Sequence, residues 1–260
     1  MELAGELRRP RTVEDAVAEQ QRLRGLVRAE SVGDVARWRT AAGVDVAYDD
    51  EAGVCAAAVA VLDVASLDVV DAVTAVSHIE FPYVPGLLAF REIPAVAAAL
   101  SRLAGAPDVF VCDGYGVAHP RRVGLASHLG VLTGIPAFGV AKNPLYFRCD
   151  EPGAERGSST PLLDGAEAVG RALRTQPGVK PLYVSAGHLV GVDEACAVTL
   201  GLARRYRLPE TTRAADQLCR RALAEAGSSG PAASGGTAPT ASRSVSRAVR
   251  PGSTGRGRSR

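Results

Sequence analysis

The sequence predicts an α/β protein of three layers, in which helices cover both faces of a central mixed sheet. Three observations support this prediction. Between residues 38 and 78, strand-like segments follow one another with no helix between them. From residue 94 onward, helix-like and strand-like segments alternate, as they do in sheets with parallel neighbours. Finally, the apolar run Val109–Val111 ends abruptly at Asp113, which is typical of a buried strand that ends at a ligand site.

The first part of the chain is expected to form one helix and then an antiparallel meander. Thr12 is a suitable N-cap for a helix over residues 12–29, and two acids follow it in the first turn. Turn residues at 49–50 and 65–66 separate three segments rich in Val and Ala, and such short connections favour antiparallel pairing. The three strands are expected at residues 38–48, 54–64 and 67–78.

The second part of the chain alternates helices and strands. A stiff, proline-bounded loop, Phe81–Gly86, precedes a helix that we expect to begin at Pro94, just downstream of Glu92. Three antiparallel strands followed by this alternation is the element order expected of a ribonuclease H-like fold. The elements after the loop are expected as helix 94–103, strand 108–113, helix 121–134, strand 136–141, strand 181–186, helix 192–206 and helix 211–226.

Composition indicates a globular protein of a reducing compartment. Of the 260 residues, 47% are hydrophobic but only 5% are aromatic, so Val, Ala and Leu must build the core. The five cysteines are scattered without any CxxC pairing, which argues against a disulfide framework and against a zinc site. The N-terminus lacks the apolar region of a signal peptide, and the longest apolar run, residues 54–62, is too short to span a bilayer. We therefore expect a cytoplasmic protein with no membrane segment.

Residues 227–260 differ in composition from the rest of the chain. They are almost entirely Gly, Ser, Ala, Thr, Pro and Arg, with six arginines and no acid. Since the whole chain carries +2 and this segment +6, residues 1–226 carry −4. Such a segment cannot bury a core, so we expect a folded domain over residues 1–226 and a disordered basic tail over 227–260. The tail would either attract polyanions through counterion release or serve only as a solubilising extension.

Two carboxylates are predicted to meet at one end of the sheet. Asp45 interrupts an apolar strand, where a charge is costly unless something charged meets it. In the expected topology the first and fourth strands are neighbours, which brings Asp45 beside Asp113. Two such carboxylates repel each other, so that one retains its proton unless a cation joins them. Hard oxygen ligands favour Mg²⁺ or Mn²⁺ over zinc, although Asp113 by itself is equally compatible with a strand-capping residue in an ordinary turn.

Six segments of the chain resemble motifs of the endonuclease V family, and they occur in the family's order. They are GVDVAY (43–48), FPYVPGLLAFREIPA (81–95), DVFVCDGYGVAHPRRVGLASHLG (108–130), GIPAFGVAK (134–142), SAGHLVGVD (185–193) and YRLPETTRAAD (206–216). The resemblance extends over residues 12–216 and makes residues 1–226 an endonuclease V-like catalytic domain. The basic tail is not part of the family pattern.

The resemblance implies a monomeric, magnesium-dependent endonuclease of DNA repair with a ribonuclease H-like fold. Members of this family recognise deoxyinosine in double- or single-stranded DNA, and many of them also recognise inosine in RNA. The implied cut lies at the second phosphodiester bond on the 3′ side of the altered base. It leaves 3′-hydroxyl and 5′-phosphate ends.

The resemblance also assigns the chemistry to particular side chains. The implied metal ligands are Asp45, Glu92 and Asp113. Asp216 matches a fourth acidic position, which some members fill with histidine, and two further active-site positions are matched by His119 and Lys142. Two metal ions can activate a water and stabilise the departing oxygen of a phosphodiester, while Lys142 holds a phosphate or orients that water. Without the surrounding motifs, Lys142 would be interpreted as a solvated lysine and His119 as a strand-end histidine.

Recognition of the altered base is assigned by the resemblance to the proline-bounded loop and to several glycines. Tyr83 would be a wedge, a side chain inserted between the strands of a duplex; the alternative is a loop aromatic packed on the core. The base pocket would be formed by Gly86, Leu88, Gly114, Leu125 and Gly139. Backbone groups beside such glycines can distinguish hypoxanthine from adenine by its O6 acceptor and N1–H donor, and the cost of base flipping is recovered in the pocket.

Three functions remain compatible with these residues: an inosine-directed endonuclease, a non-catalytic ribonuclease H-like nucleic-acid-binding protein, and a metal-dependent phosphatase of small molecules. The joint presence of the four acidic residues argues against a protein that has lost catalysis. The wedge-like segment PYVPG, residues 82–86, argues against the phosphatase, because a small substrate needs no strand separator.

Overall fold

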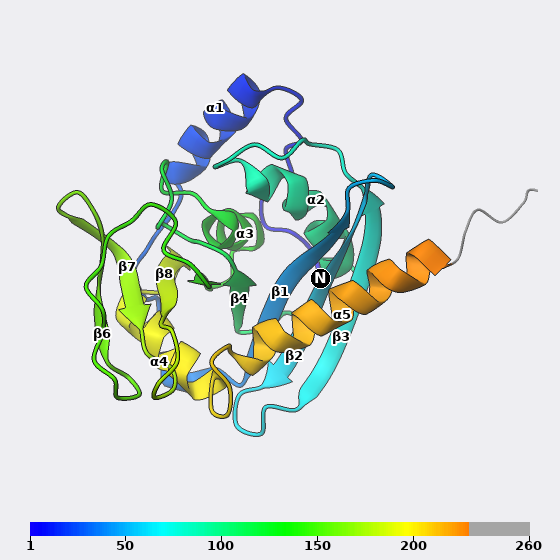
Figure 1. The fold of residues 1–260 in the computed structure, drawn as a ribbon. Coiled ribbons are helices and arrows are strands. Elements are labelled where there is room, and N and C mark those ends of the chain that lie inside the picture. The colour runs from blue at the N-terminus through cyan, green and yellow to red at the C-terminus, as the bar shows by residue number, and fades with distance from the viewer. Residues whose placement is uncertain (229–260) are drawn as a thin grey trace, which may run out of the picture. The chain divides into compact units, whose positions relative to one another are not determined.

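The structure, a computed structural model, describes residues 1–228 of the chain (Figure 1). Within these residues, a single sheet of eight strands has the order β3-β2-β1-β4-β5-β8-β7-β6. β1, β2 and β3 form an antiparallel meander, β4 pairs with β1 in parallel, and β5 pairs with β4 in parallel. The strands are β1 (Thr40–Asp49), β2 (Val54–Asp63), β3 (Val69–His78), β4 (Val109–Asp113), β5 (Ala137–Ala141), β6 (Ser159–Asp164), β7 (Glu167–Leu173) and β8 (Leu182–His188).

Helices cover both faces of this sheet. The core on one face lies beneath α2 and α3, and the core on the other face lies beneath α4 and α5. The helices of the described residues are α1 (Val13–Arg24), α2 (Leu88–Leu100), α3 (Leu125–Thr133), α4 (Val192–Leu202) and α5 (Glu210–Ser228), with a short 3-10 helix at Val35–Arg37. The predicted three-layer, ribonuclease H-like arrangement is therefore confirmed.

The alternation of side chains along β1 decides which residue reaches which face. Ala42 and Val44 belong to the core beneath α2 and α3, whereas Ala41 belongs to the core beneath α4. Asp45 continues this alternation and lines a cleft together with residues of α5. β1 and β4 are parallel neighbours in which Val44 is opposite Cys112, so the following residues, Asp45 and Asp113, lie at the same end of the sheet as predicted.

α5 crosses directly over β1 because β1 has a glycine at the crossing point. A Cβ on Gly43 would lie only 1.9 Å from the carbonyl oxygen of Thr211, in the first turn of α5. The helix can approach the strand this closely only where no side chain stands between them. Figure 1 shows α5 running across β1, β2 and β3. This crossing carries Asp216 to the cleft that Asp45 lines.

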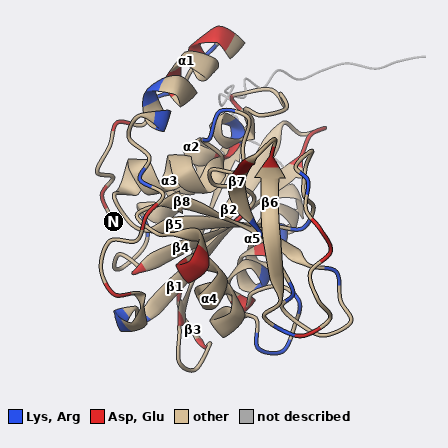
Figure 2. Ribbon diagram, turned by 90° about the vertical axis from the view of Figure 1, so that its left-hand side faces the viewer, with Lys and Arg blue, Asp and Glu red and all other residues tan. Residues whose placement is uncertain are grey.

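α1 covers the loop that precedes α2. Ala16 packs with Phe81, Leu87 and Phe90 in a small apolar cluster. The predicted N-cap is confirmed, since the Thr12 hydroxyl accepts a hydrogen bond from the backbone N–H three residues later. The acidic first turn and the basic last turn of α1 match the helix dipole, and they are visible at opposite ends of the helix in Figure 2.

The predicted start of α2 is wrong. The helix begins at Leu88 rather than at Pro94, so Glu92 lies inside the helix and not upstream of it. Proline favours the first turn of a helix because it lacks a backbone N–H. Here the burial of Ala89 and Ile93 against the sheet outweighs that preference and extends the helix toward its N-terminus.

Two other predictions differ from the structure. α3 begins at Leu125 rather than at 121, because the preceding residues form a turn: Arg122 has φ +60° and donates its backbone N–H to the His119 carbonyl at 2.9 Å. The β6–β7 hairpin was not predicted, because β6 mixes exposed and half-buried residues around one buried residue, Leu162, and so has no apolar period. The remaining elements agree in type and differ only at their ends.

No helix of residues 1–228 is long and apolar enough to cross a membrane. The predicted basic tail, 227–260, lies outside the described residues except for its first two, which complete α5.

Candidate active site

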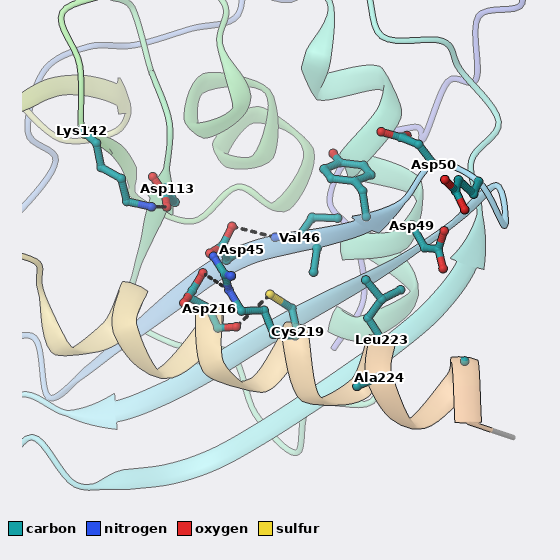
Figure 3. Close-up of a pocket in the computed structure, with 15 residues that line it drawn as sticks. Asp45, Val46, Asp49, Asp50, Asp113, Lys142, Asp216, Cys219, Leu223 and Ala224 are labelled. Atoms are coloured by element: carbon teal, nitrogen blue, oxygen red, sulfur yellow. Dashed lines mark hydrogen bonds and ion pairs between the residues drawn. The ribbon is translucent and has the colours of Figure 1, made fainter.

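A cleft of about 800 Å³ lies where β1, β4 and α5 meet. It is lined by Asp45 from β1, Asp113 from the end of β4 and Asp216 from α5, and by Lys142, which directly follows β5. Figure 3 shows how these four side chains converge from their separate elements. The fold therefore assembles an acidic site from four distant parts of the sequence, and two cationic side chains, Lys142 and Arg220, line it as well.

Asp45 occupies a position that disfavours its charge. Burial, and then the charge of Asp113, raise the pKa of Asp45 to about 7. The backbone N–H of Val46, which donates to Asp45 Oδ1 at 2.8 Å, and the charge of Lys142 only partly offset this effect. The charge of Asp113 thus disfavours the charge of Asp45, in the direction that the strand order predicts.

Lys142 forms an ion pair with Asp113. Burial by itself would lower the pKa of Lys142, but the hydrogen bond to Asp113 and the surrounding carboxylates raise it. The Arg207 guanidinium donates to the carbonyl oxygen of Lys142 at 3.1 Å and fixes the backbone from which the lysine extends. Lys142 is therefore a positioned cation at the acidic cleft.

Asp216 lies on the more open side of the cleft. Its side chain is 36% exposed and forms an ion pair with Arg220, one helical turn further on, at 2.8 Å. Asp216 also lines an adjoining cavity of about 280 Å³, to which Arg213 and Arg220 contribute cationic side chains. The acidic cleft thus adjoins a cavity in which cationic and acidic side chains are mixed.

Glu92 is held by the only tyrosine of the GVDVAY motif. The Tyr48 hydroxyl donates to Glu92 Oε1 at 2.8 Å, and the Arg91 guanidinium lies 4.5 Å from the centre of the Tyr48 ring. The other oxygen, Glu92 Oε2, is buried and has no hydrogen-bond partner. Burial raises the pKa of Glu92 to about 8, although the Tyr48 hydrogen bond opposes the rise.

The acidic residues fit a divalent cation, but they are not arranged as a ready-made site. Among residues 1–228, no three His, Cys, Asp or Glu side chains are grouped as a metal centre. However, a cation would give the unpartnered Glu92 oxygen a partner, and its positive charge would offset the unfavourable negative charge of Asp45. The donors are all hard oxygens, as Mg²⁺ and Mn²⁺ prefer. The residues that could hold such an ion are Asp45, Glu92 and Asp113.

A second pocket, of about 200 Å³, adjoins the cleft because Asp113 lines both. Among its lining residues are Glu92 and six residues predicted from the sequence: Tyr83, Gly86, Leu88, Gly114, His119 and Leu125. Gly139 does not line this pocket. It lies in β5, where a Cβ would come within 2.5 Å of the Gly114 carbonyl oxygen, so its lack of a side chain lets the turn after β4 lie against β5.

The loop before α2 contributes an exposed side chain at this pocket, and the first turn of α2 contributes two backbone N–H groups. Tyr83 is 66% exposed, which does not fit an aromatic packed in the core. Leu87, at the N-cap, makes no capping hydrogen bond with its side chain. The backbone N–H groups of Leu88 and Ala89 have no acceptor within the described residues and belong to residues that line the pocket.

Two of the residues that shape this site, Tyr48 and Gln20, could not be singled out from the sequence. Tyr48 lies in a quoted motif, but its contact with Glu92 joins two elements and has no local pattern. Gln20, which also lines the second pocket, is a glutamine within a surface helix and gave no signal at all.

Known proteins resemble this chain in sequence along most of its length. A family model described as Endonuclease V matches residues 21–217. Endonuclease V of Streptomyces avermitilis is 63% identical over 217 residues, which cover 84% of this chain and 95% of that protein. Endonuclease V of Streptomyces coelicolor is 61% identical over 217 residues, covering 84% of this chain and 93% of that protein.

Solved structures agree with the sequence comparisons. The crystal structure of endonuclease V from Streptomyces avermitilis has a TM-score of 0.82 and 62% identity, covering 84% of this chain and 96% of that chain. Endonuclease V of Ciona intestinalis, crystallised with a 24mer DNA containing an inosine followed by a ribo-adenosine, has a TM-score of 0.71 and 27% identity, covering 82% of this chain and 98% of that chain. With its sequence matched over residues 21–217 and its fold shared with these structures, the chain belongs to the endonuclease V family.

Proposed function

We propose that the chain is a magnesium-dependent endonuclease that nicks DNA at the second phosphodiester bond 3′ to a deoxyinosine and so initiates repair of deaminated adenine. The observation that carries this proposal is the position of Asp113, which lines both the acidic cleft and the smaller pocket. A base held in the pocket would leave the neighbouring backbone beside the carboxylates. Recognition and cleavage are thereby coupled at one residue.

The proposed metal ligands are Asp45, Glu92 and Asp113, with Asp216 as a fourth acidic group. The chain's membership of a family of metal-dependent nucleases supports this assignment, as does the unpartnered oxygen of Glu92. Mg²⁺ suits these ligands, and Mn²⁺ is the expected substitute. When bound, such an ion activates a water and stabilises the charge that develops on the departing oxygen.

Lys142 is proposed to bind a phosphate of the substrate. Its side chain is 42% exposed at the cleft, and the neighbouring carboxylates keep its pKa raised, so it is cationic at neutral pH. Arg213 and Arg220, in the adjoining cavity, extend this cationic surface to further phosphates of the same strand. These side chains orient the backbone relative to the acidic residues.

The pocket is proposed to bind hypoxanthine after the base leaves the stack. The unpaired N–H groups of Leu88 and Ala89 are donors that suit the O6 acceptor of hypoxanthine, whereas adenine presents an amino donor at the same position. The exposed ring of Tyr83 is the proposed wedge that fills the space left by the base. Gly114 and Leu125 complete the walls of the pocket.

The complex of the Ciona intestinalis relative supports this substrate class. That endonuclease V was crystallised with DNA containing an inosine followed by a ribo-adenosine. Because a ribonucleotide directly follows the inosine in that DNA, inosine-containing RNA is the second substrate of interest for the present chain.

We also propose that the protein acts as a monomer in a reducing compartment such as the cytoplasm. The fold that carries the cleft and the pocket is self-contained, with one sheet and its covering helices within residues 1–228. The five cysteines are free, and four of them are buried.

The proposal is tested by incubating an end-labelled duplex that contains one deoxyinosine with the protein. With Mg²⁺, the deoxyinosine strand should be cut once, at the second bond on the 3′ side, while a matched deoxyadenosine duplex stays intact. Chelation should stop the reaction, and Mn²⁺ should restore it. The cleavage rate of a matched inosine-containing RNA, compared with that of the DNA, measures the preference between DNA and RNA. If the protein hydrolyses p-nitrophenyl phosphate but leaves the deoxyinosine duplex uncut, it is a small-molecule phosphatase. If it binds the duplex without cutting it, it is a non-catalytic binding protein.

A further inference from the structure

We propose that Gln20, His119 and Arg121 form a clamp on the carbonyl oxygen of Gly86, and that this clamp sets the shape of the pocket for the substrate base. These three side chains are called the Gly86 clamp below. The inference rests on the proposed function, because it makes Gln20 a positioning residue for recognition of the base. Gln20 lies just outside the segment matched by the family model, residues 21–217.

Three side-chain donors converge on one backbone oxygen. Gln20 Nε2 lies 2.9 Å from the Gly86 oxygen, Arg121 Nη2 lies 2.8 Å from it, and His119 Nε2 lies 3.0 Å from it. A carbonyl oxygen has two lone pairs, so these contacts saturate it. The Gly86 carbonyl is therefore occupied by the protein itself and is not free to contact a base.

Gln20 connects three separate segments through its amide group. Its Nε2 also donates to the carbonyl oxygen of Val123 at 3.1 Å, and its Oε1 accepts a hydrogen bond from Arg121 Nε. The Gln20 side chain is fully buried, at 0% exposure. A buried amide is costly unless its polar atoms are paired, and here both are paired. Gln20 thus ties α1 to the loop before α2 and to the loop before α3.

His119 is fully engaged in the same network. Its Nδ1 accepts a hydrogen bond from the backbone N–H of Arg121 at 3.2 Å, which leaves the proton on Nε2 to be donated to Gly86. Burial, and then the charge of Arg121, lower the pKa of His119 to about 4, so the ring is neutral near pH 7. With both ring nitrogens occupied, His119 positions the Gly86 carbonyl rather than transferring a proton.

Gly86 is the joint between the Tyr83 loop and α2. Its φ of +78° is in the region that favours glycine, and the N–H of the next residue, Leu87, donates to the Val84 carbonyl at 2.9 Å. The peptide between Gly86 and Leu87 is therefore fixed through both its C=O and its N–H. Because this peptide directly precedes the unpaired N–H groups at the start of α2, the clamp fixes the backbone that carries these groups beside the pocket.

Replacing the amide of Gln20 by a side chain of similar volume tests the clamp. Gln20→Met removes both hydrogen bonds that Nε2 donates, and Gln21→Met is the matched control, since Gln21 is the next residue of the same helix and is exposed. Without added metal, fluorescence anisotropy measures the Kd for a deoxyinosine duplex and for a matched deoxyadenosine duplex. Gln20→Met should weaken binding of the deoxyinosine duplex about tenfold and change binding of the other duplex by less than about twofold. Gln21→Met should change neither.

Arg121→Lys provides a second test of the clamp. It is the deciding variant if a thermal melt shows that Gln20→Met does not fold. The lysine keeps the charge but loses the forked contact to Gly86 and Gln20, so the same selective loss is expected. In the double variant, the loss should be smaller than the sum of the two single losses, because both side chains act on one carbonyl. Folded variants that retain the wild-type preference for deoxyinosine, or that weaken binding of both duplexes equally, would overturn the clamp. A wild-type protein with no such preference would instead refute the proposed function.

Discussion

Asp45 shows, at the scale of one residue, how the fold favours a bound cation. Burial and Asp113 raise its pKa from the ordinary 3.8 to about 7. Below about pH 4 the carboxyl is protonated in both the folded and the unfolded chain, so it contributes nothing there. Between about pH 4 and pH 7 the unfolded chain releases this proton while the folded chain retains it, so stability falls as the pH rises. Above about pH 7 the carboxyl is ionised in the folded chain as well, so the full cost of its buried charge lowers the free energy of unfolding.

Asp45→Asn should therefore stabilise the metal-free protein at high pH. A shift of this size corresponds to about 4 kcal/mol at pH 8, and the gain should vanish near pH 3.5. Urea unfolding of both proteins at pH 8 and at pH 3.5, with a chelator present, measures the difference in the free energy of unfolding. A gain that is the same at both pH values would show that the charge of Asp45 is not the cause.

Tyr48 is a residue whose single hydroxyl should control a metal ligand. It donates to Glu92 Oε1, so Tyr48→Phe leaves that carboxylate without its orienting hydrogen bond. We expect the Mg²⁺ concentration for half-maximal nicking to rise about tenfold, with a matching loss in calorimetric Mg²⁺ binding. The control is Tyr146→Phe, because Tyr146 is exposed and its hydroxyl forms no hydrogen bond within residues 1–228. Unchanged Mg²⁺ binding in Tyr48→Phe would remove Tyr48 from the site.

At the scale of elements, the site depends on the close approach of α5 to β1. A methyl group on Gly43 would collide with the Thr211 carbonyl, which is backbone and cannot rotate away. Gly43→Ala should cost about 1–3 kcal/mol of stability and should slow nicking, because the displaced helix carries Asp216. Gly105→Ala is the control, since a Cβ there meets nothing within 4 Å. A thermal melt and a nicking rate for both variants measure the effects, and equal behaviour would contradict the proposed role of Gly43.

Most elements could be predicted from the sequence because each carries a local signal. The meander has two turns between apolar segments, and β4 has an apolar run that ends in Asp113 and glycines. The β6–β7 hairpin lacks such a signal because β6 mixes exposed, half-buried and buried residues without an apolar period. α2 starts earlier than predicted because burial of apolar residues outweighs the local preference of Pro94.

The candidate site was predictable only in part, for a similar reason. The pairing of Asp45 with Asp113 follows from the order of the strands, and the pocket residues follow from the family resemblance. The contact of Tyr48 with Glu92 and the contact of Gln20 with Gly86 join residues 44 and 66 positions apart. Such contacts depend on side-chain geometry between elements and leave no pattern within any one of them.

At the scale of the whole molecule, charge is divided between the domain and its C-terminal segment. Residues 1–226 carry −4 and residues 227–260 carry +6. Deleting 229–260, which leaves α5 complete, should preserve the nicking rate at saturating substrate but weaken non-specific DNA binding. If all six arginines contact phosphates, the slope of log K against log salt should decrease in magnitude by up to about 0.9 for each. Identical salt slopes with and without the segment would show that it plays no part in binding.

Asp113 lines both the acidic cleft and the base pocket, and Asp45 lies beside it at the same end of the sheet. The most direct test is single-turnover nicking of a deoxyinosine duplex by Asp113→Asn and Asp45→Asn at saturating Mg²⁺. Asp68→Asn, an exposed aspartate in the turn between β2 and β3, is the control. Both site variants should lose at least about a thousandfold in rate while the control keeps the wild-type rate. Near-wild-type nicking by either site variant would contradict the assignment of the cleft as the catalytic site.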